Sequence, residues 1–155
     1  MDKAEHYRDL KAEIDSVVSG ETSVTARYAT AACILAQAMA PRFFWTGFYI
    51  VDALKPRELV VGPYQGTLGC LRIPFGKGVC GHVAATGEPV IVPDVHAFPG
   101  HIACDSASNS EVVVPVFDTD GELVAVLDVD STDLDAFDAT DLEGLVAICN
   151  SLLVA

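Results

Sequence analysis

The sequence predicts an α+β fold in which two N-terminal helices and a C-terminal helix cover one face of a central antiparallel sheet. Three observations predict it. Apolar residues recur with helical spacing near both ends of the chain, apolar runs of strand length lie between them, and an Asp-Gly pair typical of a hairpin separates the last two runs. With 155 residues, 51% of them hydrophobic, residues 1–155 are expected to form a single domain.

The first half of the chain predicts two helices followed by a hairpin. Helical spacing covers residues 3–19 and 22–40, and each stretch ends at a glycine or a proline. The aromatic and β-branched run 43–51 predicts a central strand, and 58–62 predicts its short partner.

The middle of the chain predicts a long irregular insertion. Residues 63–109 are rich in glycine and proline, and only a short helix near 78–86 and a short strand at 89–92 interrupt them. Insertions of this length in a compact domain are usually functional, so we expect the active site here.

Regular structure resumes after the insertion. Residues 111–117 and 123–130 predict two strands joined at Asp120-Gly121. The chain then predicts a helix over 139–153, with Thr140 and Glu143 as a capping box.

The charge balance and cysteine count limit the possible partners. Nine Lys and Arg against 22 Asp and Glu give a net charge of −13, which disfavours binding to nucleic acid and to membrane surfaces. The acidic N-terminus does not resemble a secretory signal, so we expect a cytoplasmic protein. Five cysteines in that reducing compartment indicate a transient catalytic disulfide rather than a structural framework. We identify no cofactor.

Cys70, Cys80 and Cys104 lie in Gly-rich or small-residue segments that look accessible to solvent. Accessible cysteines are candidates for redox chemistry. Cys33 and Cys149 lie within helical apolar patterns and are expected to be inert core residues.

The last hairpin predicts a cluster of acids. A two-residue turn at Asp120-Gly121 places Glu111 opposite Asp130, and a turn shifted by one residue places Glu111 opposite Asp128. In both registers the three carboxylates share one face of the sheet. A three-residue loop would break this alignment. Carboxylates this close together repel one another, so they need either a nearby cation or raised pKa values. The ammonium group of a ligand would supply the cation. The alternative is a solvated strand end. The opposite face is apolar and should pack on helices: Leu123, Ala125, Leu127 and Val129.

Two other kinds of site compete with this interpretation. Three thiols and His101 could bind zinc, although no pair has Cys-x-x-Cys spacing, so we expect no metal. A cysteine hydrolase would need a base and an orienting group, for which His101 is a weak candidate.

The strings 72–81, 92–96 and 98–111 strongly resemble the free methionine-(R)-sulfoxide reductases, a family of GAF-domain enzymes. The resemblance implies a GAF fold and reduction of free methionine (R)-sulfoxide. It implies that Cys104 attacks the sulfoxide sulfur, that Cys80 or Cys70 forms a disulfide with it, and that thioredoxin restores the thiols. Cys80 is the second candidate for the attacking thiol.

The same resemblance implies that Glu111, Asp128 and Asp130 contact the substrate. It also implies that Trp45 packs against the methyl group of the substrate. It also makes a homodimer through the terminal helices possible. The rival functions are a GAF-type small-molecule sensor without catalysis and a thiol-based oxidant sensor, since fold alone does not fix function.

Overall fold

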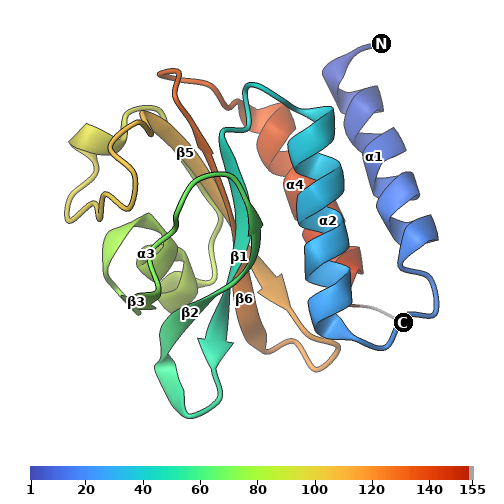
Figure 1. Cartoon of the computed structure of the whole chain (residues 1–155), viewed down its shortest axis with the longest axis horizontal. Coiled ribbons are helices and arrows are strands. Elements are labelled where there is room, and N and C mark those ends of the chain that lie inside the picture. Colours follow the sequence, from blue (N-terminus) through green and yellow to red (C-terminus); the bar gives the residue numbers. More distant parts are fainter. Residues whose placement is uncertain (154–155) are drawn as a thin grey trace.

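The computed structural model describes residues 1–153, which form one antiparallel sheet with helices on both faces (Figure 1). Numbered in chain order, the six strands of the sheet lie side by side in the order β3-β2-β1-β6-β5-β4. The elements are α1 (Lys3–Val17), α2 (Val24–Ala38), β1 (Trp45–Asp52), β2 (Lys55–Gln65), β3 (Arg72–Pro74), α3 (Gly78–Thr86), β4 (Val90–Val92), the 3₁₀ turn η1 (Val95–Ala97), β5 (Ser110–Phe117), β6 (Leu123–Ser131) and α4 (Ala139–Leu152).

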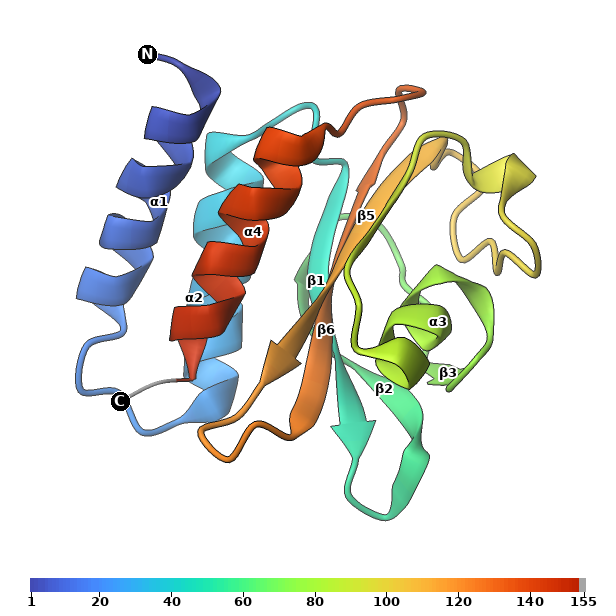
Figure 2. The same cartoon turned by 180° about the vertical axis from the view of Figure 1, so that it is seen from behind.

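The predicted fold class is confirmed, with one refinement in how the helices are layered. α2 and α4 lie directly on one face of the sheet, whereas α1 packs against them on the side away from the sheet (Figures 1 and 2). α3 and the irregular segments cover the other face. No helix among residues 1–153 has the length and apolar character needed to cross a membrane.

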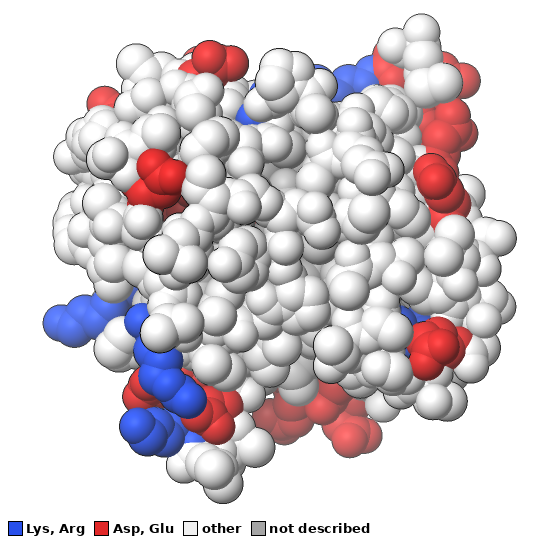
Figure 3. All heavy atoms as spheres, viewed as in Figure 1, with Lys and Arg blue, Asp and Glu red and all other residues white. Residues whose placement is uncertain are grey.

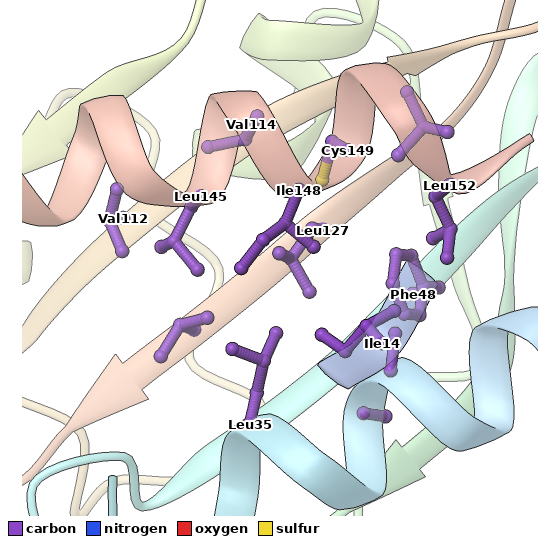
Figure 4. Close-up of a cluster of buried hydrophobic side chains, with 14 of the residues drawn as sticks. Ile14, Leu35, Phe48, Val112, Val114, Leu127, Leu145, Ile148, Cys149 and Leu152 are labelled. Atoms are coloured by element: carbon purple, nitrogen blue, oxygen red, sulfur yellow. The ribbon is translucent and has the colours of Figure 1, made fainter. Parts of the chain in front are cut away.

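The main core fills the space between the sheet and the three long helices. In Figure 4, Leu145 and Ile148 of α4 lie beside Leu127 of β6, and Leu35 of α2 approaches from the other side. The Tyr28 and Phe48 rings stack with centroids 4.5 Å apart. Cys149 is buried in this core, as predicted for an inert residue, while Cys33 is only partly buried.

The β5–β6 hairpin reaches the predicted register by a different route. The Asp118 amide donates to the Glu122 carbonyl at 2.9 Å, so the loop contains three residues, not two. A bulge at Val124 then adds one residue to β6, because Val116 pairs with Ala125 and Phe117 with Leu123. The extra residue compensates for the longer loop and restores the alignment of the acids.

The same bulge corrects one prediction about the apolar face. Ala125, Leu127 and Val129 pack into the helix-covered core as predicted, but Leu123 lies against the smaller cluster on the other face. β2 is also longer than the predicted 58–62, and with β3 it shortens the irregular segment.

α4 begins at an acidic network that the sequence interpretation placed incorrectly. Asp138 and Asp141, not Thr140 and Glu143, form the capping box. The Asp141 side chain is fully buried, and it accepts hydrogen bonds from the Tyr7 hydroxyl at 2.7 Å and from Arg42 and Lys3 at 3.0 Å. These contacts join α1, α4 and the segment before β1.

We predict that Asp141→Ala lowers the free energy of unfolding by about 2–4 kcal/mol, because it removes the N3 carboxylate of the capping box and leaves the buried Tyr7 hydroxyl unpaired. Urea denaturation measures the change. Asp138→Ala, at the exposed end of the network, is the matched control and should cost about 1 kcal/mol. Equal losses in the two variants would contradict a special role for Asp141.

Candidate active site

The sheet face opposite α2 and α4 carries a pocket that collects most of the predicted site residues. It opens between α3, the end of β6 and the two loops that carry Cys70 and Cys104, and its volume is about 520 Å³ counting the open mouth. Six of the seven predicted residues line it, and the seventh, Cys70, is bonded to one of them. The six are Trp45, Cys80, Cys104, Glu111, Asp128 and Asp130.

Three carboxylates form the floor of the pocket. Glu111 of β5 pairs directly with Asp130 of β6, and Asp128 lies two residues along the same strand, so all three point to one face. One carboxylate oxygen of each lies within 4.8 Å of those of the other two. All three side chains are buried. The predicted cluster is therefore present, and it is enclosed rather than solvated.

Burial and mutual repulsion govern the protonation of this cluster. Burial, and then the charges of Asp128 and Asp130, raise the pKa of Glu111 well above its ordinary value. Burial and the charge of Asp130 likewise raise the pKa of Asp128. The pKa of Asp130 is raised to about 6 by burial, although hydrogen bonds with the other two acids oppose the shift. The cluster therefore retains protons near neutral pH.

One atom of the cluster has unmet hydrogen-bonding capacity. Asp128 Oδ1 is buried and has no hydrogen-bond partner among the described residues. A buried, unpaired carboxylate oxygen is costly, so this atom is suited to a donor supplied by a ligand. Within residues 1–153, the one grouping of side chains able to hold a metal is the acid cluster itself, and it contains no cysteine. The three thiols and His101 form no such grouping among these residues.

A disulfide joins Cys70 to Cys104 across 34 residues, with the two Cα atoms 5.2 Å apart. Two hydrogen bonds hold the loops that carry it. Trp45 Nε1 donates to the Thr67 carbonyl at 2.8 Å, and the Thr67 hydroxyl donates to Asp105 at 2.6 Å. Gly69 permits the close approach, because a Cβ there would lie 2.9 Å from the Trp45 ring.

Cys80 differs from the prediction of an accessible thiol. It lies in the first turn of α3 and is buried, because α3 packs its small residues against the sheet. Burial, followed by the charges of Asp128 and Glu111, raises the pKa of the Cys80 thiol well above its ordinary value. A thiol held neutral in this way is a poor nucleophile.

Aromatic rings form one wall of the pocket. The Trp45 ring stacks on Tyr49 and on Tyr64, with centroid separations of 5.6 Å and 4.9 Å. Tyr49 lies on the pocket and was missed by sequence reasoning, although its position four residues after Trp45 on one strand places both on the same face. Burial and the nearby Asp128 raise the pKa of the Tyr49 hydroxyl, which therefore stays protonated.

Two further pocket residues had only weak sequence signals. His101 lines the pocket, and its Nδ1 is buried without a hydrogen-bond partner among residues 1–153. Lys77 is the single Lys or Arg among the lining residues. It directly precedes α3, within the Gly76-Lys77-Gly78 string.

Comparisons with known proteins show which proteins this chain is similar to. The GAF domain family model matches residues 22–155. The free methionine-R-sulfoxide reductase of Escherichia coli (strain K12) is 42% identical over 145 residues, which cover 94% of this chain and 85% of that protein. The reductase of the same name from Saccharomyces cerevisiae is 38% identical, with 94% and 82% covered. The X-ray structure of free methionine-R-sulfoxide reductase from Neisseria meningitidis in complex with its substrate has a TM-score of 0.92 and 49% identity, covering 98% of this chain and 89% of that one.

We predict that the unliganded protein is less stable at pH 7.5 than at pH 5.5. The three acids have higher pKa values in the folded than in the unfolded state, so the folded state binds more protons and its stability falls as the pH rises from about 4 through 6. Asp130→Asn should raise the free energy of unfolding at pH 7.5 by roughly 1–2 kcal/mol. It should also flatten the pH dependence.

Urea denaturation at the two pH values tests this. The matched control is Asp120→Asn, which removes the same charge from the exposed end of the hairpin and should leave the pH dependence unchanged. Identical pH profiles for wild type and Asp130→Asn would contradict the prediction.

Proposed function

The chain belongs to the free methionine-R-sulfoxide reductase family of GAF domain proteins, and we propose that it reduces free L-methionine (R)-sulfoxide to methionine. One observation carries the proposal: a cysteine that already forms a redox disulfide lies on the same pocket as three buried carboxylates. The pocket combines a nucleophile, a proton donor and a site for a cation.

The pocket suits a free amino acid. An ionised Asp130, with the unpaired Oδ1 of Asp128, supplies the negative charge that an α-ammonium group needs. Lys77, which also lines the pocket, would meet the carboxylate of the same molecule. The Trp45 ring provides an apolar wall for the sulfoxide methyl group. Methionine sulfoxide within a peptide lacks the free ammonium and would leave the acids without a partner.

The acid cluster also supplies the proton that the reaction requires. The Cys104 thiolate attacks the sulfoxide sulfur while Glu111, protonated near neutral pH, donates a proton to the sulfoxide oxygen. Methionine leaves, and Cys104 retains the oxygen as a sulfenic acid. The Cys70 thiol then attacks the Cys104 sulfur and releases water, which produces the disulfide of the present structure.

Thioredoxin is the proposed reductant of this disulfide, with the cytoplasm as the compartment that keeps it reduced. Cys70 is the preferred resolving thiol, because it is already joined to Cys104, whereas Cys80 would have to leave its buried position. A homodimer through the terminal helices stays a prediction from the resemblance. A sensor without catalysis is not favoured, because binding alone has no need of the Cys70–Cys104 pair.

We predict that Cys104→Ser lowers the turnover of free methionine (R)-sulfoxide by more than about 1,000-fold, because the nucleophile is lost. Dithiothreitol-driven methionine release from the R and S epimers measures this. Cys33→Ser is the matched control outside the pocket and should retain wild-type turnover. Turnover by Cys104→Ser near the wild-type rate would refute the proposed function.

We predict different kinetic defects for two acids of the cluster. Glu111→Gln should lower kcat by about 10²–10⁴-fold, the usual contribution of a general acid. Asp130→Asn should mainly raise KM, because it weakens the ammonium site while leaving the proton donor in place. N-Acetylmethionine sulfoxide should be a poor substrate for the wild type. Comparable rates for the free and N-acetylated compounds would contradict the ammonium site.

A further inference from the structure

The two segments that carry the disulfide contain no charged residue, although Arg72 and Asp105 directly follow them. Thirty-one of the 155 residues are Asp, Glu, Lys or Arg, from the 22 acidic and 9 basic residues, yet residues 59–71 and 95–104 contain none. These two segments carry Cys70 and Cys104. On the face shown in Figure 3, charged side chains gather mainly at the edge and the central area is uncharged. The loop after β2 crosses the front of this same view in Figure 1.

Large apolar side chains project from this uncharged surface. Leu68 and Leu71, two residues before and one residue after Cys70 in the chain, are 78% and 73% exposed. Ile102, two residues before Cys104, is 37% exposed. Leucines that flank a redox bond and contribute little to the core indicate a binding surface rather than structural packing.

The disulfide indicates what this surface binds. Each turnover leaves the Cys70–Cys104 bond oxidised, so a two-electron donor has to reach it before the next turnover. Cys104 is exposed, whereas Cys70 is half-buried. The Cys104 side of the bond is therefore the more accessible to an incoming thiolate. A net charge of −13 would repel many acidic partners, and the uncharged loops provide an approach where that repulsion is weakest.

We propose that Leu68, Leu71 and Ile102 form a docking surface for a protein that presents a pair of neighbouring thiols on an apolar surface. This inference rests on the proposed function, since that function makes the disulfide recur in every cycle. Three apolar side chains form a small contact, and small contacts are typical of transient redox complexes.

The exchange on this surface balances in two steps. A thiolate of the partner attacks the Cys104 sulfur, forming a mixed disulfide and releasing Cys70 as a thiolate that takes up a proton. The second thiol of the partner, as its thiolate, then attacks the partner's own sulfur in that mixed disulfide and releases the Cys104 thiolate. The partner loses two electrons and becomes a disulfide, and the two cysteines of this chain are reduced.

Leu71→Ser tests the docking surface without changing the pocket. Leu71 does not line the pocket, and because its side chain is exposed the variant should keep the wild-type fold, which a thermal melt verifies. The experiment starts from the oxidised protein and follows reduction of its disulfide in a single turnover, first by reduced thioredoxin and then by dithiothreitol. Methionine sulfoxide is absent, so the result does not depend on the proposed substrate.

We expect the second-order rate of reduction by thioredoxin to fall by at least about 10-fold in Leu71→Ser, as for loss of a central apolar contact. The rate with dithiothreitol should stay within about twofold of wild type, because a small dithiol needs no docking surface. Leu54→Ser is the matched control. Leu54 is 91% exposed and lies before β2, whereas the Leu71 carbonyl accepts a hydrogen bond from the Val61 amide within β2. The strand from Lys55 to Val61 therefore separates the two side chains by roughly 20 Å.

Three results would overturn the proposal. The first is an unchanged thioredoxin rate in Leu71→Ser. The second is a loss of equal size in Leu54→Ser, which would make the effect one of general surface hydrophobicity. The third is a parallel loss with dithiothreitol, which would mean that the substitution changed the disulfide itself. Failure of methionine release in the separate turnover assay would instead refute the proposed function.

Discussion

The pairing of β5 with β6 is the constraint on which the rest of the site depends. Because strand side chains alternate, one register places Glu111, Asp128 and Asp130 on one face and Ala125, Leu127 and Val129 on the other. A slip by one residue would exchange the faces, burying acids under α2 and α4. The apolar side therefore specifies the register, and the acidic side is brought together as a consequence.

The acid cluster in the pocket destabilises the folded state, and packing in the core on the other face of the sheet offsets this cost. Buried acids within 4.8 Å of one another destabilise the folded chain, and the paired core on the opposite face supplies the compensating burial. The Asp141 network contrasts with the pocket, because its buried carboxylate has donors from Tyr7, Arg42 and Lys3. The protein supplies the hydrogen-bond donors of the Asp141 carboxylate, whereas the acids of the pocket lack donors that a ligand can provide.

The redox chemistry adds a second constraint, which concerns the loops rather than the sheet. The disulfide, the Thr67–Asp105 hydrogen bond and the absence of a Cβ at Gly69 hold two segments distant in sequence against the Trp45 wall. Cys80, although it lies near the same acids, is held in a buried helix turn where its thiol stays neutral. The location of a cysteine on a loop or a helix thus decides whether it is accessible or buried with a neutral thiol.

The sequence by itself determined the element types, the α+β class and the shared face of the three acids, and it singled out Cys70, Cys80 and Cys104 as candidates, because these follow from periodicity, composition and local strings. The tertiary structure alone decided the bulge at Val124, which restores the register despite a three-residue loop, and the burial of Cys80. It also decided the outer position of α1 and which further residues line the pocket, namely Tyr49, His101 and Lys77. Each of these depends on contacts between residues far apart in the chain. Local propensity contains no information about which segments will meet, and it therefore could not predict them.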